Sequence, residues 1–361
     1  MKVALESSSL FFKNYTGIPF YIYNLFMAMM DLEGLSPTLA FRLKKKFGSH
    51  TDFHKRLLEK DHTWHFGNQL LKPTKFDVSH SLHTPFLNLR NTLRVVTVHD
   101  LAVHLPEFKD FDFATPYFKK KRFALFEQFA KKADVIITVS ERTKKDFIQF
   151  FDFPEEKIHA VPLAPSFTMS NGTYQPSNIL NKHDLTPKGY FISMGGVSLR
   201  KNTYNLIKAY HISRSKSDFK LVITGKIETA LETEVRKYIS SNQLENKVIL
   251  TQYLPNNDLQ ELYTNARAFL FPTFYEGFGI PILEAMIAGL PVLTSSTGAA
   301  PETAGDFAIL VDPFRPDSIA KGIDKLPDVE HGHLERAKTY ANSYTWEKTA
   351  KATVSIYEKY M

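Results

Sequence analysis

Short hydrophobic runs recur along the chain, and stretches with helical spacing separate them. In the first half the runs are KVAL (2–5), FDVS (76–79), RVVTV (94–98), DVIITV (134–139) and KIHAV (157–161). Helical patterns lie between several of them, around residues 18–30, 115–132 and 141–151. Short apolar runs bounded by polar turns are consistent with buried strands. The first half is therefore expected to alternate strands with helices.

The same alternation is clearer in the second half. The expected strands are YFISM (190–194), KLVIT (220–224), KVILT (247–251), AFLFP (268–272), PVLT (291–294) and AILVD (308–312), and the expected helices lie near 202–213, 229–241, 257–266, 281–288 and 317–326. Strands that alternate with helices predict parallel sheets covered on both faces. A stretch rich in Pro, Ser, Asn and Gly (161–178) is the expected linker between two doubly wound α/β domains.

Composition narrows the class of protein. The chain has 361 residues, more than the roughly 250–300 at which a single core stops growing, which agrees with two domains. It contains no cysteine, so disulfides, thiol catalysis and thiolate metal sites are excluded. The beginning, MKVALESSSLFF, lacks the unbroken apolar stretch of a signal peptide, and no segment is long enough for a membrane span. We expect a cytoplasmic protein, at most peripheral at the inner face of the cytoplasmic membrane.

Positive charge is concentrated in the first half. Residues 1–175 hold 24 Lys and Arg against 18 Asp and Glu, and the basic runs are KKK (44–46), KKKR (119–122), KK (131–132) and KK (144–145). Such runs are usually a solvated face. The alternative is a surface that meets anionic lipid or a phosphate-bearing substrate. Nucleic acid is not expected as a partner, because no binding motif accompanies the charge.

Polar residues that follow strands are the candidate chemistry, because parallel sheets bind ligands outside the carboxyl ends of their strands. YFISM is followed by GGVSLRKN, which contains Gly195, Gly196, Arg200 and Lys201. Glycines allow a ligand to approach the backbone, and cations near the start of a helix bind anions. An ordinary loop with exposed basic residues is an equally good explanation of this stretch alone.

The stretch YEGFGIPILEAMIAGLPVLT (275–294) follows the strand AFLFP. We expect Pro281 at the first position of a helix, Glu284 in its first turn and Glu276 on the preceding loop. The amides of Phe278, Gly279 and Ile280 then lie at the positive end of the helix dipole, and Gly289 ends the helix. An anion-binding helix end beside two carboxylates suits a phosphate bridge between two polyols, as in a nucleotide-sugar.

These motifs resemble a known family. Glu276 and Glu284 have the E-x7-E spacing of retaining glycosyltransferases with the GT-B fold, and residues 276–302 resemble the donor-site signature of glycosyltransferase family 4, the group 1 glycosyl transferases. GVSLRKN, LVITGK, TVHDLAVHLPEF and ADVIITVSERTKKDF resemble other parts of that family, and the VHD variant resembles bacterial polysaccharide mannosyl- and rhamnosyltransferases. The resemblance implies two Rossmann-like domains that face each other across a cleft. The acceptor-side domain would be 1–170, closed by a final helix over 345–361, and the donor domain 171–344.

The resemblance also implies roles for individual residues. Glu276 would bind hydroxyls of the transferred sugar, Glu284 the ribose of the nucleotide, and Arg200 with Lys201 the departing diphosphate. His99 would contact the sugar and support an oxocarbenium-like transition state, while Asp100 orients its loop. The remaining donor-binding positions are Gly195, Gly196, the amides of Phe278, Gly279 and Ile280, the loop residues Gly17 and Ile18, and Leu254 on the base side.

The implied reaction is a retaining transfer without metal or cofactor. The donor is a nucleotide-sugar, and the VHD residues favour GDP-mannose. The acceptor would be a surface polysaccharide or a lipid-linked glycan such as O-antigen. Front-side attack within an ion pair is the implied mechanism, with the diphosphate taking the acceptor proton. Gln252 stands before Tyr253 where the family usually has Gly, so the base is not assigned.

Other candidate sites have structural explanations. The DFD at 110–112 matches the Asp-x-Asp of metal-dependent transferases, but Phe108, Phe111 and Phe113 surround it, and we interpret it as an aromatic loop. His80 and His83 follow a strand and could line the acceptor side. The stretch 113–132 mixes aromatic residues with lysines and could lie on a membrane surface, but packing on the sheet explains it equally well.

Three classes of function remain open from the sequence. The first is a retaining glycosyltransferase, with a dTDP- or UDP-sugar as the alternative donor. The second is a GT-B-like nucleotide-sugar epimerase or a phosphorylase. The third is a non-catalytic protein that binds lipid or nucleic acid through its basic half, which leaves Glu276, Glu284, Arg200 and Lys201 without a purpose.

Overall fold

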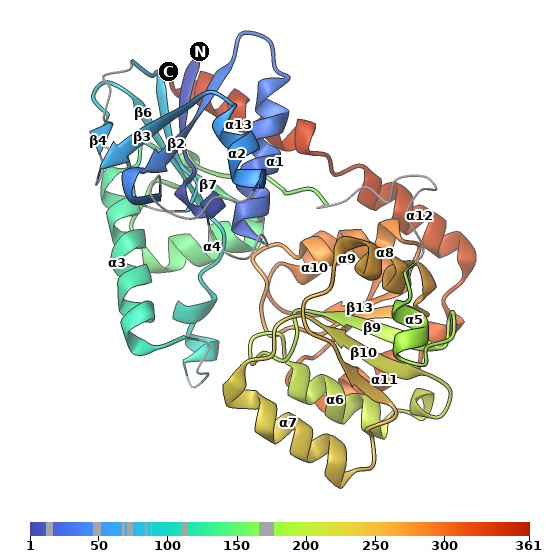
Figure 1. The fold of residues 1–361 in the computed structure, drawn as a ribbon. Coiled ribbons are helices and arrows are strands. Elements are labelled where there is room, and N and C mark those ends of the chain that lie inside the picture. The colour runs from blue at the N-terminus through green and yellow to red at the C-terminus, as the bar shows by residue number, and fades with distance from the viewer. Residues whose placement is uncertain are drawn as a thin grey trace. The chain divides into compact units, whose positions relative to one another are not determined.

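The computed structural model describes residues 1–11, 17–45, 52–66, 69–70, 75–83, 85–87, 89–109, 111, 114–165 and 177–361 (Figure 1). The chain divides into two compact units. Unit 1 comprises Met1–Pro106, Ala114–Ala164 and Tyr344–Met361, and unit 2 comprises Glu107–Phe113 and Pro165–Ser343. Residues 166–176 of the expected linker lie outside the described part of the chain.

Unit 1 is built on a sheet with eight strands in its described part. These are β1 (Lys2–Glu6), β2 (Ser36–Arg42), β3 (His62–Phe66), β4 (Gln69–Leu70), β5 (Val78–Ser81), β6 (Leu93–Val98), β7 (Val135–Thr138) and β8 (Ile158–Ala160), in the order β4-β3-β2-β1-β5-β6-β7-β8. β4 pairs antiparallel with β3, and the other neighbours are parallel. The order reverses between β1 and β5, as in doubly wound folds.

Helices pack on this sheet through their apolar faces. They are α1 (Ile18–Met30), α2 (Asp52–Leu58), α3 (Pro116–Lys132), α4 (Glu141–Phe150) and α13 (Trp346–Tyr360). The α3 helix begins after Thr115, whose hydroxyl caps the amide of Phe118 at 3.3 Å, and it buries Phe126 and Phe129 against β6 and β7. The α13 helix lies beside α1, and the two appear in red and blue in Figure 1.

In its described residues, unit 2 is built on a sheet of six strands, all parallel. These are β9 (Tyr190–Met194), β10 (Lys220–Thr224), β11 (Val248–Leu250), β12 (Ala268–Phe271), β13 (Val292–Ser295) and β14 (Ala308–Val311), in the order β11-β10-β9-β12-β13-β14. This is the 3-2-1-4-5-6 order of a dinucleotide-binding fold. Its reversal point lies between β9 and β12.

Both faces of the unit 2 sheet are covered. Figure 1 shows α8, α9 and α10 on one face and α6 and α11 on the other. The helices are α5 (Ile179–Lys182), α6 (Thr203–Ile212), α7 (Thr229–Ser241), α8 (Asn256–Asn265), α9 (Ile280–Ile287), α10 (Ala300–Ala304), α11 (Pro316–Ile323) and α12 (His331–Asn342). Burial on both faces explains why these strands read as continuous apolar runs.

The expectation of two parallel-sheet α/β domains is confirmed. The predicted bounds of β9, β10, α1 and α7 match the structure residue for residue. The sequence reading missed β2, β3 and β4. The β2 strand opens with Ser-Pro, and β3 (HTWHF) has histidines where an apolar run was sought, so neither fits the pattern of a buried strand.

Candidate active site

The loops that leave β9 and β12 meet at the reversal point of the unit 2 sheet. The β9 loop carries Arg200 and Lys201, and the β12 loop carries Glu276. Lys201 Nζ donates to Glu276 Oε1 at 2.8 Å, and Arg200 Nη1 lies 3.2 Å from the same oxygen. Two stretches about 75 residues apart in sequence thus form one cluster of two cations and one carboxylate.

Glu276 is a buried carboxylate that remains charged. Its exposed fraction is 8%. Burial alone would raise the pKa of Glu276, but the charges and hydrogen bonds of Arg200 and Lys201 hold it below the usual value. An ionised carboxylate accepts hydrogen bonds only, so this group is suited to hydroxyl donors.

Backbone contacts fix the two cations. Asn202 is left-handed (φ 59°), and its side-chain amide donates to the carbonyls of Pro272 (2.9 Å) and Pro313 (2.6 Å). The amide of Phe274 donates to Arg200 O at 3.1 Å. These bonds tie the β9 loop to the β12 loop, so both cations have a defined position before any ligand binds.

Glycine is required at position 195. Its φ is +106°, and a Cβ there would lie 2.7 Å from Cγ of Lys201. At position 196 a Cβ would overlap the carbonyl of Lys226. Side chains at these positions would displace Lys201 or the β10 loop, which explains the glycine pair.

The α9 helix begins at the end of the β12 loop, after the left-handed N-cap Gly279 (φ 109°). Phe278, Gly279 and Ile280 lie at its amino end, as predicted. The prediction for Glu284 is wrong in one respect, because Ile280 is the first helical residue and Glu284 therefore lies in the second turn. The helix ends in a Schellman motif, in which Leu290 N donates to Ala285 O (3.0 Å).

Glu284 is buried on α9, with an exposed fraction of 4%. Burial raises the pKa of Tyr263 on α8, and the negative charge of Glu284 raises it further. Glu284 is therefore close enough to Tyr263 for an electrostatic interaction. Leu254, after β11, is half-buried beside the exposed Tyr253. Their roles in nucleotide binding stay predictions.

His99 follows β6 in unit 1 and has a defined tautomer. Its Nε2 lies 2.8 Å from the carbonyl oxygen of Leu82, so Nε2 carries the proton and Nδ1 is left as an acceptor. Burial, with a smaller contribution from the charge of Arg122, lowers the pKa of His99 to about 4. Asp100 Oδ1 accepts from the amide of Ala102 at 3.2 Å, a hydrogen bond within the loop that Asp100 is predicted to orient.

A buried hydrogen-bond network lies behind His99. His80 is fully buried, with Nδ1 2.5 Å from the Tyr357 hydroxyl and Nε2 2.8 Å from Thr97 Oγ1. The hydroxyl of Tyr21 lies 3.0 Å from Thr97 Oγ1, and its ring packs edge-on against His99 at 4.8 Å. The expectation that His80 lines the acceptor side is wrong, because its ring is enclosed in the core.

Comparisons with known proteins agree with this geometry. The family model described as "Glycosyl transferases group 1" matches residues 177–344, and the one described as "Glycosyltransferase Family 4" matches residues 42–164. O-antigen chain mannosyltransferase B of Escherichia coli is 30% identical over 291 residues, which are 76% of this chain and 73% of that protein. The chain belongs to glycosyltransferase family 4.

Two further similarities fit the family. O-antigen chain mannosyltransferase RfbU of Salmonella typhimurium is 27% identical over 290 residues, which are 78% of this chain and 71% of that protein. The crystal structure of Anabaena HepE is similar to 99% of this chain, and the similarity covers 100% of the HepE chain. The TM-score is 0.73 and the sequence identity is 16%. The GT-B fold expected from the sequence is confirmed, and the family 4 member described here is a glycosyltransferase.

In this family 4 chain, a second polar cluster surrounds His99 in unit 1. Arg122 on α3 lies over the ring of Phe126 at 4.8 Å and interacts electrostatically with His83, His99, His104 and Asp100. Burial lowers the pKa of Arg122, and Asp100 partly offsets this. Sequence reasoning missed Arg122, because it lies in the basic run KKKR, whose neighbours Lys120 and Lys121 are exposed.

Gly17 and Ile18 are at the amino end of α1. Gly17 is its N-cap (φ 59°), and its carbonyl accepts from the amide of Tyr21 at 3.0 Å. The preceding residues of the YTGIPFY motif, Tyr15 and Thr16, lie outside the described part of the chain. The predicted contact of Gly17 and Ile18 with a diphosphate stays a prediction.

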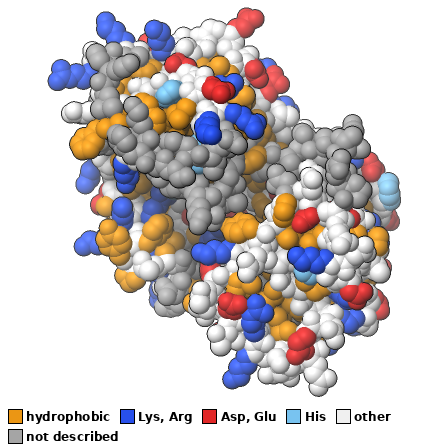
Figure 2. Space-filling view, viewed as in Figure 1, with side chains coloured by type: hydrophobic (Ala, Val, Ile, Leu, Met, Phe, Trp, Pro, Cys, Tyr) orange, Lys and Arg blue, Asp and Glu red, His pale blue; other side chains and the backbone are white. Residues whose placement is uncertain are grey.

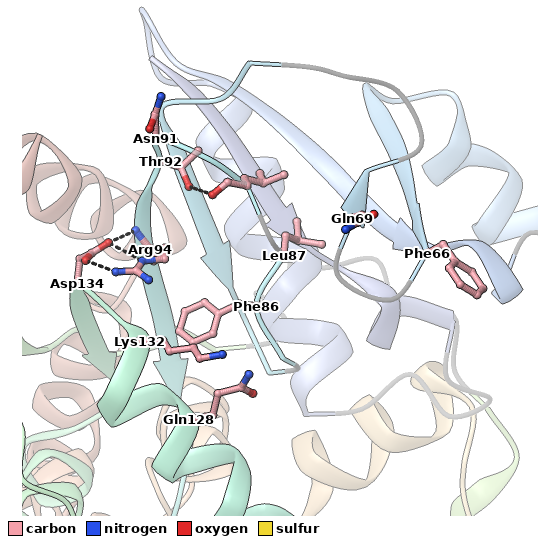
Figure 3. Close-up of a pocket in the computed structure, with 11 residues that line it drawn as sticks. Phe66, Gln69, Phe86, Leu87, Asn91, Thr92, Arg94, Gln128, Lys132 and Asp134 are labelled. Atoms are coloured by element: carbon pink, nitrogen blue, oxygen red, sulfur yellow. Dashed lines mark hydrogen bonds and ion pairs between the residues drawn. The ribbon is translucent and has the colours of Figure 1, made fainter.

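Unit 1 has a cavity of about 860 Å³ that is distinct from these residues, and Figure 3 shows side chains that line it. It lies where β6 and β7 begin, beside the ion pair between Arg94 Nη2 and Asp134 Oδ1 (2.8 Å). Ligands of parallel sheets bind at the opposite, carboxyl edge. We therefore do not assign this cavity to the active site.

Three remaining expectations concern metal, membrane and charge. Asp110 and Asp112 of the DFD motif lie outside the described residues, and within the described part no group of three or more His, Asp or Glu could hold a metal ion. In the same part, no helix has the length and apolar character of a membrane span. In the view of Figure 2, Lys and Arg side chains are interspersed with neutral and acidic ones.

Proposed function

We propose that this family 4 protein is a retaining, metal-independent mannosyltransferase that uses GDP-mannose and no cofactor. Its acceptor would be a growing surface polysaccharide or lipid-linked glycan, met at the inner face of the cytoplasmic membrane. The names of the two relatives, both O-antigen chain mannosyltransferases, support the sugar and the acceptor class. The observation that carries the proposal is the cluster of Arg200, Lys201 and Glu276 at the reversal point of the donor-side sheet.

The two cations are placed to bind a diphosphate. Both now share one oxygen of Glu276, which neutralises part of their charge. The oxygens of an incoming diphosphate would compete with Glu276 for Arg200 and Lys201. The carboxylate would then turn to the hydroxyls of the sugar. Positive charge fixed at the leaving group stabilises the negative charge that develops there in the transition state.

The other predicted residues complete the donor site in this proposal. The amides of Phe278, Gly279 and Ile280, with Gly195 and Gly196, would bind phosphate or sugar oxygens. Glu284 would accept from the ribose hydroxyls, Leu254 would lie beside the base, and Gly17 with Ile18 would close over the diphosphate. His99, which carries its proton on Nε2, would accept a hydrogen bond from a sugar hydroxyl at Nδ1.

The chemical step would need no protein base. The bond between the anomeric carbon and the diphosphate oxygen breaks, and the acceptor oxygen attacks the same face of the sugar. The acceptor proton passes to the departing diphosphate, and GDP leaves. In this proposal Glu276 binds hydroxyls of the sugar and does not act as a covalent nucleophile. A sugar trapped covalently on Glu276 would contradict this step.

A thermal-shift screen of the full chain tests the donor. GDP-mannose is expected to raise the melting temperature more than UDP-glucose, dTDP-rhamnose or UDP-N-acetylglucosamine at equal concentration, because only the donor that binds the native state tightly stabilises it. The shift should vanish in Lys201→Ala. No shift with any nucleotide-sugar would contradict the proposal.

A UDP-sugar is the second candidate donor. HepE, the structural neighbour, was solved in complex with UDP and glucose, and residues 252–254 of this chain do not assign the base. The larger shift would then come from UDP-glucose in the same screen. Release of free sugar or an epimer without transfer to an acceptor would instead favour an epimerase.

A further inference from the structure

A short segment between two stretches of unit 1 belongs to unit 2. The chain leaves unit 1 after Pro106, runs through Glu107–Phe113 in unit 2, and returns to unit 1 at Ala114. Its described part includes the end of a 3-10 turn (Pro106–Phe108) and Phe111. The sequence singled out this stretch only as an aromatic loop. Its assignment to the donor-side unit raises the question of what its rings contact.

The rings of this segment contact the loop that carries Glu276. Phe108 meets Tyr275 edge-on, with ring centroids 6.0 Å apart at 77°. Phe111 meets Phe274 at 4.8 Å and 65°. Phe314 lies 6.3 Å from Phe108, 6.2 Å from Phe111 and 5.2 Å from Phe274. Edge-to-face pairs at these distances add stability beyond the area they bury.

The ring that Phe108 contacts is held from other directions too. Tyr275 is fully buried, and its Cδ2 would lie 3.3 Å from a Cβ at Gly298. Its carbonyl accepts from Arg200 Nη1 at 3.0 Å, and the next carbonyl, that of Glu276, accepts from Ala299 N at 2.9 Å. Phe108, itself only 3% exposed, packs edge-on against this ring.

The position of Tyr275 therefore sets the position of Glu276. The two residues share a peptide bond, and the ring of Tyr275 is packed against Phe108 and held near Gly298. If Phe108 were shortened, the ring could shift toward the space left behind. The carbonyl bound by Arg200 and the carboxylate bound by both cations would move with it. Binding groups that are displaced by an ångström lose much of their effect.

We propose that Phe108 is a positioning residue of the donor site, acting through the ring of Tyr275 on the carboxylate of Glu276. This inference rests on the proposed role of Glu276 in binding the donor sugar. Phe111 and Phe314 support Phe108 from the side. A stretch close in sequence to His99 thereby contributes to the geometry of the donor-side carboxylate.

A double-mutant cycle on the full chain tests the inference, with the dissociation constant of GDP-mannose measured by calorimetry. Phe108→Ala is expected to weaken binding about fivefold to tenfold in the wild-type background and less than about twofold in Glu276→Gln, because coupled residues are non-additive. Phe108→Leu, which keeps most of the apolar volume, should bind within about twofold of wild type. It also covers the case in which the alanine variant does not fold.

The matched control is Phe307→Ala in the same unit. Phe307 packs on Tyr340 (5.0 Å) and His333 (5.6 Å), away from the Glu276 loop, so its loss should lower the melting temperature but leave the dissociation constant unchanged. If Phe108→Ala and Phe307→Ala bind GDP-mannose equally well, the role of Phe108 is contradicted while the proposed function stands. The same holds if Phe108→Ala weakens binding as much in the Glu276→Gln background as in wild type. If Glu276→Gln itself binds GDP-mannose like wild type, the proposed function fails as well.

Discussion

Glu276 in unit 2 and His99 in unit 1 are both shielded, titratable side chains that follow a parallel strand, and their surroundings push them to opposite charge states. Two cations lie within 3.2 Å of Glu276 and hold the pKa of its carboxyl below the usual value, so it is charged. Burial lowers the pKa of His99 to about 4, with a smaller contribution from the charge of Arg122, so its ring is neutral. Burial disfavours the charged form of both groups. At Glu276 the two cations outweigh burial, whereas at His99 burial outweighs the Leu82 carbonyl and the charge of Asp100, which favour the protonated ring.

The difference separates two kinds of task. In unit 2, the positive charges of Arg200 and Lys201 lie together and Glu276 partly neutralises them, as a site for an anionic leaving group requires. In unit 1, a neutral imidazole donates to Leu82 O and packs against the ring of Tyr21, whose hydroxyl belongs to a neutral hydrogen-bond network, as suits a site for sugar hydroxyls. The three predictions below test one side of this comparison each.

The largest effect is expected from removing a cation in unit 2. Lys201→Ala should lower kcat/KM by about 10²–10³, because one of the two charges that stabilise the departing diphosphate is lost. The measurement is transfer from the best donor of the thermal-shift screen.

Lys208→Ala is the matched control for Lys201. Lys208 lies on α6 with its Nζ 4.0 Å from the centre of the Tyr204 ring, on the helix that follows the β9 loop. Its loss should change kcat/KM by less than about twofold. An equal loss of activity in both variants would show that the role of Lys201 is not specific.

A smaller effect is expected from opening the network in unit 1. Tyr357→Phe removes the hydroxyl that lies 2.5 Å from His80 Nδ1 and leaves a buried nitrogen unpaired. The free energy of unfolding should fall by about 1–3 kcal/mol, measured by urea denaturation. Tyr360→Phe on the same helix should cost less, since Tyr360 is half-buried and bonds Glu156 O at 2.6 Å. Equal losses would argue against a special role of the buried network.

The smallest effect concerns pH. Burial lowers the pKa of His80 to about 3. At a pH between this value and the usual pKa of histidine, His80 is therefore neutral in the folded chain and protonated in the unfolded chain. The stability from neutral His80 is complete above pH 6.5 and is lost as pH falls from there toward 3. The loss is about 1.4 kcal/mol per pH unit within that window. His80→Gln should reduce the slope of stability between pH 6 and 5 by that amount. An unchanged slope in His80→Gln would mean that His80 is protonated in the folded protein.

The sequence predicted the donor-side loops well because each carries a local signal. Arg200, Lys201 and Glu276 directly follow apolar strands, and the rule for parallel sheets places such residues at one edge. Gly298 and Ala299, which hold the backbone of Glu276, were missed, although the same rule applied to the loop after β13 would have pointed to them. The turn predicted for Glu284 was wrong because the helix begins at Ile280, one residue before the predicted first position Pro281.

Contacts that depend on tertiary packing could not be predicted from the sequence. His80 and His83 lie three residues apart, and only the position of α13 shows that Tyr357 encloses His80 in the core. In the sequence, nothing distinguishes Arg122 from its exposed neighbours Lys120 and Lys121. Only the packing of α3 on the sheet shows that Arg122 is partly buried and lies over the ring of Phe126. Phe108 belongs by sequence to the first half of the chain, and its contact with Tyr275 has no local signal at all.

Calorimetric titration of wild type and Glu276→Gln with GDP-mannose and with GDP tests the central claim most directly. If Arg200 and Lys201 hold the diphosphate while Glu276 holds the sugar, wild type prefers GDP-mannose to GDP. Glu276→Gln should lose that preference by about tenfold or more and bind GDP at least as tightly as wild type, because the carboxylate no longer competes for the two cations. An unchanged preference in the variant, or no binding of either compound by wild type, would contradict the account.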